Sequence, residues 1–158
     1  MLFRSLTNEE LVKIRDVNKG TLKTAVLSTV FAVSAGAAGL EPALEALFAQ
    51  ADAAIAAGHS ILILSDRAMG RESVPMPSLL ACAAVHHHLI RQGTRTRVSL
   101  VVETGEAREM HHFAVLIGYG ANAINPYLAF ETIENEVRRG FFPDGMDAAT
   151  AITNYMKS

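Results

Sequence analysis

Ile61-Leu62-Ile63-Leu64-Ser65-Asp66-Arg67, residues 61–67, is the stretch that decides the fold. Its four consecutive aliphatic residues indicate a strand that is buried on both faces, as in a parallel sheet. On its N-terminal side, Leu40–Ala57 is rich in alanine and leucine and predicts a helix that stops at Gly58. On its C-terminal side, Ser78–Gln92 predicts a second helix, closed by Gly93. A strand enclosed by two helices is typical of a βαβ unit.

The same alternation of strands and helices continues in both directions along the chain. Further strands are expected at Thr24–Val33, Arg97–Glu103 and Asn122–Asn125, further helices at Thr7–Val17, Glu106–Gly118, Pro126 to Arg139 and Asp147–Met156, and loops at Ser34–Gly39 and Ala68–Pro77. Helical crossovers of this length join parallel strands, almost always with a right-handed connection. The sequence therefore predicts an α/β fold of about four mainly parallel strands with flanking helices, either an open sheet or a partial-barrel βα repeat.

The composition excludes several classes of protein. The chain has 158 residues, of which 50% are hydrophobic, so it suits one domain with a sizeable core. Its net charge of −2 and the lack of a basic block argue against nucleic-acid binding. No apolar run approaches the ~20 residues of a membrane span. The single cysteine, Cys82, permits neither an internal disulfide nor an iron–sulfur cluster and favours a reducing compartment.

Polar residues follow the predicted strands where each strand ends. Asp66 and Arg67 follow one strand, Glu103 ends the next, and Asn125 ends the last. Ligands and partners of parallel α/β sheets bind beyond the carboxyl ends of the strands. We expect these four residues to form one face, with a buried Asp–Arg or Glu–Arg pair joining adjacent strand ends. The alternative is ordinary helix capping, because Thr104 and Asn125 stand where N-caps belong.

The histidines raise the question of a metal site. His86, His87 and His88 are consecutive, so on a helix they point about 100° apart and cannot share one ion. The apolar spacing places His86 in the buried stripe, His87 on its flank and His88 opposite. Glu109 and His112 make a single Glu-x-x-His, whereas di-iron bundles need two such motifs. We expect hydrogen-bonded core histidines in place of metal ligands.

Two further motifs favour structural roles. Gly118-Tyr119-Gly120-Ala121-Asn122-Ala123 matches the G-x-G-x-x-A dinucleotide fingerprint, but it leaves a helix and enters a strand, whereas the fingerprint does the reverse. A glycine-rich turn at a helix C-terminus explains it better. Cys82 lies mid-helix among alanines and leucines, where a thiol is buried and inert.

Several long motifs resemble one family, and they occur in order between Ile61 and Glu131. They are Ile-Leu-Ile-Leu-Ser-Asp-Arg (61–67), Pro-Met-Pro-Ser-Leu-Leu-Ala (75–81), Ala-Val-His-His-His-Leu-Ile-Arg (84–91), Val-Val-Glu-Thr-Gly-Glu-Ala-Arg-Glu-Met-His-His-Phe (101–113) and Ile-Gly-Tyr-Gly-Ala-Asn-Ala-Ile-Asn-Pro-Tyr-Leu-Ala (117–129). They resemble the central domain of the glutamate synthase large subunit. Residues 21–60 fit that domain less distinctively.

The resemblance implies a role within a larger enzyme. In that family a glutamine amidotransferase domain, with an N-terminal cysteine as nucleophile, releases ammonia. An FMN-binding domain with a 3Fe–4S cluster uses the ammonia to convert 2-oxoglutarate into glutamate. No cysteine lies near residue 1, so the amidotransferase nucleophile is missing, and the resemblance implies that the FMN-binding barrel and the cluster cysteines lie beyond residue 158. We therefore expect neither catalytic nor cofactor-binding nor metal-binding residues in this chain, and no activity from it alone.

The expected role is that of a structural module that links the amidotransferase and FMN-binding domains and helps to wall the ammonia path. Residues 1–20 would be a lead-in helix and linker, 21–140 the central α/β domain, and 141–158 a turn and helix leading toward the FMN-binding domain. Asp66, Arg67, Glu103 and Asn125 would face the neighbouring domains, and an excised domain could self-associate. The expected location is the cytoplasm, or the plastid stroma in a photosynthetic eukaryote. The alternative is a stand-alone metal- or ligand-binding protein that uses Glu103 and the histidine clusters.

Overall fold

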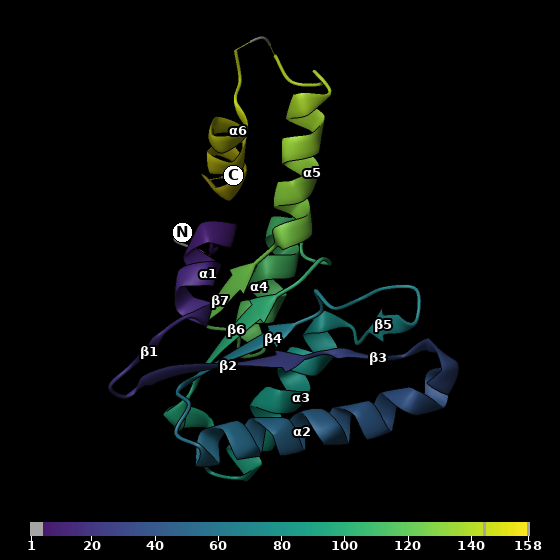
Figure 1. Ribbon diagram of the computed structural model, residues 1–158, viewed down its shortest axis with the longest axis vertical. Helices are drawn as coiled ribbons and strands as arrows, with labels where there is room; N and C mark the ends of the chain where they lie inside the picture. Colours follow the sequence, from purple (N-terminus) through teal and green to yellow (C-terminus); the bar gives the residue numbers. More distant parts are fainter. Residues whose placement is uncertain (1–4, 144, 158) are drawn as a thin grey trace.

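A computed structural model describes residues 5–143 and 145–157 and shows a five-stranded sheet in the order β1-β2-β4-β6-β7 (Figure 1). The strands are β1 (Asn18–Lys19), β2 (Leu22–Ser28), β4 (Ile61–Ser65), β6 (Ser99–Glu103) and β7 (Ala123–Asn125). The last four are parallel, and β1 is an antiparallel edge strand paired with β2. The predicted α/β class and the mainly parallel sheet are confirmed, in the form of an open sheet.

The helices cover the two faces of the sheet unequally. The crossover helices are α2 (Leu40–Ala56), α3 (Ser78–Arg91) and α4 (Met110–Gly118), and the others are α1 (Asn8–Arg15), α5 (Tyr127–Arg138) and α6 (Ala148–Lys157). The parallel strands lie side by side in chain order, so right-handed crossovers place α2, α3 and α4 on the same face (Figure 1). The main core lies between that face and those helices. On the other face, Leu11 of α1 packs against Ile63, Val101 and Ala123.

The predicted strand Thr24–Val33 is interrupted at Thr29. Beyond this residue the chain leaves the main sheet, and β3 (Val30–Ala32) pairs antiparallel with β5 (Ser73–Pro75) in a separate two-stranded sheet. The buried Thr29 explains the break, because its N–H donates to Ser65 O while its C=O accepts from Met76 N–H. Two short 3-10 helices, Val33–Ala35 and Ala37–Gly39, then lead into α2.

Local signals gave most helix ends correctly. Thr7 and Glu10 form a capping box at the start of α1, where the sequence predicts a helix. α3 ends at Arg91 and α2 at Ala56, each one residue before the predicted end. The exception is α4, which begins at Met110 and not at Glu106.

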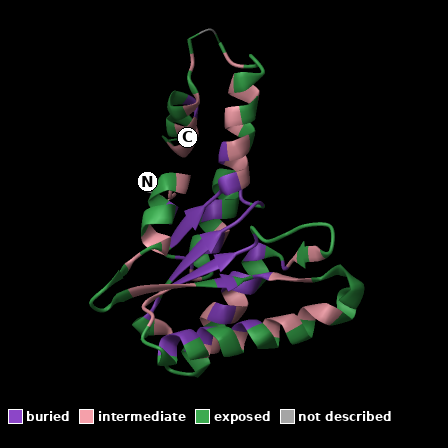
Figure 2. Cartoon of the chain, viewed as in Figure 1, coloured by how far each residue is buried: buried purple, intermediate pink, exposed green. Residues whose placement is uncertain are grey.

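The α5–α6 hairpin projects from the end of the sheet (Figure 1). Buried residues concentrate on the strands, whereas the far part of the hairpin is exposed or half-buried (Figure 2). In α5 the buried residues are Tyr127 and Phe130, both in the first turns, and in α6 the buried residue is Ala151. Asp144 of the predicted turn, residues 1–4 of the predicted lead-in and residue 158 lie outside the described residues. The division at residues 20 and 140 stays a prediction. No helix in the described ranges is long and apolar enough to cross a bilayer.

Candidate functional site

The exit edge of the sheet carries a row of polar side chains in register. Ser65 of β4 is the partner of Glu103 of β6, which is in turn the partner of Asn125 of β7. Each lies two residues after Ile63, Val101 or Ala123, so the row faces the α1 side of the sheet. Ser65 Oγ donates to Glu103 Oε2 across 2.5 Å. The three residues are buried, so parallel pairing brings together polar groups that are far apart in the sequence.

The partner of Glu103 is Arg15, at the end of α1. Its Nη2 lies 2.9 Å from Glu103 Oε1 and 2.8 Å from Oε2. Glu103 is only 2% exposed, so this charge pair compensates a carboxylate that has lost its water. The expected buried Glu–Arg pair is therefore present, but it joins α1 to the sheet and not two strand ends. No local pattern pointed to Arg15, which lies 88 positions from Glu103.

Asn125 does not cap the following helix. Its Nδ2 donates to Leu6 O and to Asn8 Oδ1, each across 2.9 Å. α5 starts at Tyr127, and its cap residue, Pro126, makes no side-chain cap. The capping explanation of Asn125 was wrong, because hydrogen bonds from its Nδ2 hold the side chain against the N-terminal segment and not over the start of α5. Within the described residues, two buried atoms here have no hydrogen-bond partner: Asn125 Oδ1 and Arg15 Nε.

Asp66 belongs to a second network, on the α3 side of the sheet. Its Oδ2 accepts hydrogen bonds from Thr104 Oγ1 and from the N–H of Gly105, both at 2.9 Å, and its carboxyl group is also hydrogen-bonded to Tyr127. Burial raises the pKa of Asp66 above its usual value, although these hydrogen bonds pull the other way. Burial and the neighbouring charge of Asp66 also raise the pKa of the Tyr127 phenol.

Two residues that the sequence analysis did not select complete the second network. Ser78 Oγ lies 2.6 Å from Glu106 Oε2 and 2.5 Å from Thr104 Oγ1. Thr104 Oγ1 also accepts from the N–H of Glu106, so the predicted capping role of Thr104 takes the form of a local turn before α4. Ser78 could have been noticed, because it follows Pro77 at a predicted helix start.

Arg67 is the most exposed of the four predicted residues. Its Nη2 donates to Glu131 Oε1 across 2.6 Å, and the two side chains are 44% and 41% exposed. Its guanidinium lies over the ring of Tyr127, 4.4 Å from the centroid. Asp66, Glu103 and Asn125 are at most 2% exposed and bind within the domain. Arg67 is thus the one of the four predicted residues that is open to solvent, and their interdomain role stays a prediction.

The buried face of α3, which carries the three consecutive histidines, is rotated from the predicted one. Its buried residues include Cys82, Val85 and Leu89, whereas Leu79 and Ile90 are partly exposed. His88 was predicted to point away from the core, but it stacks on Phe48 and contacts Asp52 Oδ2 across 2.9 Å. The apolar residues of α3 fit two neighbouring stripes, and packing against α2 selected one of them.

His86 is half-buried and accepts a hydrogen bond at Nδ1 from Arg95 Nε across 2.8 Å. Arg95 also donates to the carbonyl oxygens of Val98 and Gly120. Within the described ranges, no group of three or more His, Cys, Asp or Glu side chains is placed to hold a metal ion.

The surroundings of His86 predict acid sensitivity. Burial, then the charges of Arg95 and His87, lower the pKa of His86 below its ordinary value of 6.5. The unfolded chain therefore binds this proton more readily than the folded chain does, so stability is full above about pH 6.5 and falls as the pH drops toward the folded pKa. We expect urea midpoints to fall less on acidification in His86→Asn than in the wild type. An identical pH dependence in the two proteins would contradict this assignment.

The remaining motifs do not fit the cofactors of the resemblance. Cys82 donates to Tyr119 O across 3.7 Å, and burial raises its pKa to about 11. One buried thiol cannot ligate an iron–sulfur cluster, which needs several thiolates. Gly118 ends α4 and Gly120 lies in the turn before β7, which agrees with the predicted glycine-rich turn at a helix C-terminus. The His86 side chain fills the space beside Gly120.

Comparison with known proteins identifies the family. The family model described as "Glutamate synthase central domain" matches residues 3–158. The chain belongs to this family. The central domain is 45% identical over 153 residues to the glutamate synthase [NADPH] large chain of Bacillus subtilis (strain 168), and this match covers 97% of the domain and 10% of that relative.

Relatives named for other electron donors match the central domain as well. The glutamate synthase [NADH] of Schizosaccharomyces pombe is 41% identical over 152 residues, covering 95% of the domain and 7% of the relative. Ferredoxin-dependent glutamate synthase 2 of Synechocystis sp. is 41% identical over 165 residues, covering 97% and 10%. The central domain thus spans a tenth or less of the length of these relatives.

Proposed function

We propose that this chain is a structural module of glutamate synthase that connects the glutamine amidotransferase domain to the FMN-binding domain and helps to wall the path of ammonia between them. The parent reaction converts glutamine, 2-oxoglutarate and a reductant into two glutamates. The observation that carries this proposal is the similar identity, 41–45%, to relatives named for NADPH, NADH and ferredoxin. A module that serves all three has a task that is independent of the electron donor.

The hydrogen-bond networks at the exit edge support a scaffold function. Both buried carboxyl groups are bonded within the domain. Glu103 is paired with Arg15 of α1, and Asp66 is hydrogen-bonded to Thr104 and to Tyr127 of α5. Groups held in this way fix the geometry of the edge and are not free to transfer protons to a substrate. In this proposal FMN and the 3Fe–4S cluster belong to the neighbouring domain, and this chain supplies neither ligands nor catalytic residues.

The side chains that a stand-alone metal- or ligand-binding protein would use are already hydrogen-bonded to other residues of the domain. Glu103 is paired with Arg15, His86 with Arg95, and His88 with Asp52. His112 accepts from the N–H groups of Arg108 and Glu109 at the start of α4. These side chains lie on separate elements, which favours the module over the alternative.

The parent enzyme would work in the cytoplasm, or in the plastid stroma if the source is a photosynthetic eukaryote. The plastid is suggested by a relative from Oryza sativa subsp. japonica, the ferredoxin-dependent glutamate synthase, chloroplastic, which is 46% identical over 119 residues.

Arg67→Ala in the full-length enzyme tests the module. Arg67 is exposed, so its removal should weaken an interdomain contact without unfolding this domain. We expect the ratio of glutamate formed to glutamine hydrolysed to fall about fivefold, equivalent to ~1 kcal/mol of lost interdomain contact. The measurement pairs a glutaminase assay with a glutamate assay on the same preparation.

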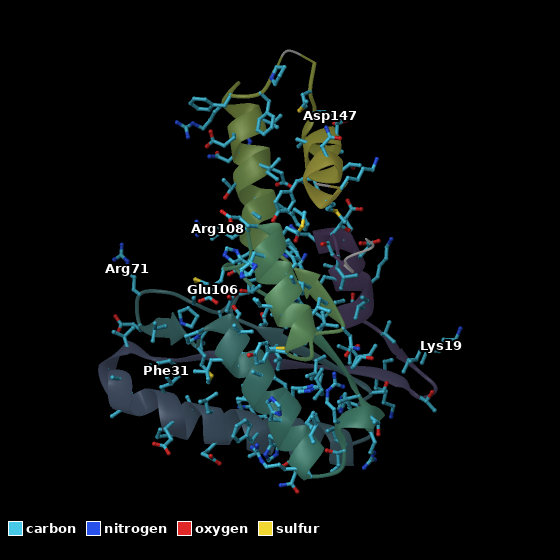
Figure 3. The ribbon with its side chains drawn as sticks, turned by 180° about the vertical axis from the view of Figure 1, so that it is seen from behind. Lys19, Phe31, Arg71, Glu106, Arg108 and Asp147 are labelled. Carbon is cyan, nitrogen blue, oxygen red and sulfur yellow. The ribbon has the colours of Figure 1, made fainter. Side chains whose placement is uncertain are left out.

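Arg71→Ala is the matched control, because Arg71 is an exposed arginine that projects from the loop before β5 (Figure 3). It should leave the ratio unchanged. Normal coupling in a folded Arg67→Ala enzyme would count against the proposal.

A further inference from the structure

An apolar groove lies between α4, α6 and the N-terminal segment, at the base of the projecting hairpin. It has a volume of about 430 Å³, and Met110, Phe113, Tyr155, Met156 and Ser5 line it. Met110 is 58% exposed and borders the groove, so its thioether is open to solvent there. Two charged residues, Arg108 and Glu109, also line the groove, and Figure 3 shows Arg108 beside the base of α5.

The wall that α6 provides is held in place by specific contacts. Tyr155 donates through its hydroxyl to Arg108 O across 2.9 Å. Its ring meets Phe113 and Phe130 edge-on, with centroids 6.5 and 6.0 Å apart. These contacts tie α6 to α4 and α5, so the groove exists before anything enters it. A preformed apolar groove loses little conformational freedom when a segment binds to it.

Both ends of the described chain reach this groove. Ser5 lines it on one side and is held against the sheet edge by a parallel bridge to Ile124. Met156 lines it on the other side, one residue before the last residue of α6. A polypeptide that continues beyond residue 158 therefore starts at the rim. Its local concentration there is high, because it is tethered to the groove.

We propose that the groove is the docking site of the stretch of the parent polypeptide that follows residue 158, a short apolar segment on the way to the next domain. This inference rests on the proposed function, because it needs a longer chain, and the matched relatives extend far beyond this domain. Ten extended residues span roughly 35 Å, enough for a segment beginning at α6 to fold back across the groove. On the N-terminal side, Ser5 and Leu6 are bonded to Ile124 at the sheet edge.

Methionine oxidation by dilute peroxide tests the groove, because it modifies exposed thioethers and is measured by peptide mass spectrometry without any activity. In full-length glutamate synthase, we expect Met110 and Met156 to oxidise about tenfold more slowly than in the 158-residue chain. Met76, which is 2% exposed, is the reference for a buried methionine in both proteins. Equal rates for Met110 and Met156 in the two proteins would overturn the inference.

Met69 separates this inference from the proposed function. It is 38% exposed and lies two residues after Arg67, at the edge assigned to neighbouring domains. If Met69 but not Met110 is protected from oxidation in the full-length enzyme, the result would support the proposed module and overturn the groove assignment. Protection of Met110 in the short chain that increases with protein concentration would show a second copy in the groove, and would also overturn it.

A photoreactive benzoylphenylalanine in place of Met110 identifies the occupant in the full-length enzyme. The expected cross-link joins position 110 to a peptide within about ten residues after Ser158, the reach given above. The same substitution at Ile90, which is 50% exposed on α3, is the control and should not capture that peptide. A cross-link from position 110 to any other part of the chain would refute the proposed occupant.

Discussion

Replacing Glu103 with alanine should lower the free energy of unfolding by about 3 kcal/mol, the lower end of the effect of breaking a buried ion pair. The substitution removes the acceptor of Arg15 Nη2 and of Ser65 Oγ at once. It also cuts the tie between α1 and the sheet, on the face where α1 covers Ile63 and Val101. The lower end applies because the Arg15 side chain is 37% exposed and can turn toward water. Urea unfolding followed by circular dichroism measures the change.

Glu131→Ala is the matched control for this experiment, since it breaks a carboxylate–arginine pair of similar length that is exposed. Its partner is Arg67, and both side chains are more than 40% exposed. The expected loss is about 0.5 kcal/mol. A double-mutant cycle of Arg15→Met and Glu103→Ala would isolate the pair energy. Equal losses in Glu103→Ala and Glu131→Ala would show that burial adds nothing at Glu103.

Gly120→Ala should destabilise the domain by about 3 kcal/mol, through backbone strain and a steric clash together. The φ angle of Gly120 is +111°, which residues with a Cβ rarely adopt. An added Cβ would lie 2.5 Å from His86 Cγ and still closer to Nδ1. Relief of the clash would displace the imidazole that Arg95 binds, and Arg95 also holds the carbonyl of Gly120. Thermal or urea unfolding of the variant checks the value.

Gly93→Ala separates the two causes. Gly93 also has a positive φ, +69°, but nothing lies within 4 Å of an added Cβ. It should lose only about 1 kcal/mol from backbone conformation. His86→Ala in the Gly120→Ala background should restore part of the lost stability by removing the clash. No recovery, with equal losses at the two glycines, would refute the steric explanation.

Much of the fold was predictable because its signals are local. The run Ile61–Leu64 needs neighbours on both faces, and these come from α2 and α3 on one face and from α1 on the other. The end of α3 also followed from nearby residues. The error at His88 had a definite cause, since alanines and leucines of α3 allow two adjacent stripes and only contact with Phe48 and Asp52 of α2 decides between them. The break at Thr29 was likewise decided by Ser65 and Met76, which are distant in sequence.

The sequence by itself determined that Asp66, Arg67, Glu103 and Asn125 share one edge, because parallel strands in chain order all end on the same side. Only the tertiary structure decided which group each one meets. Glu103 is bonded to Arg15, Asn125 to Asn8, and Arg67 to Glu131. Spacing along the chain does not encode such pairs, because burial leaves a polar group bound to whichever donor or acceptor the packed helices bring within reach.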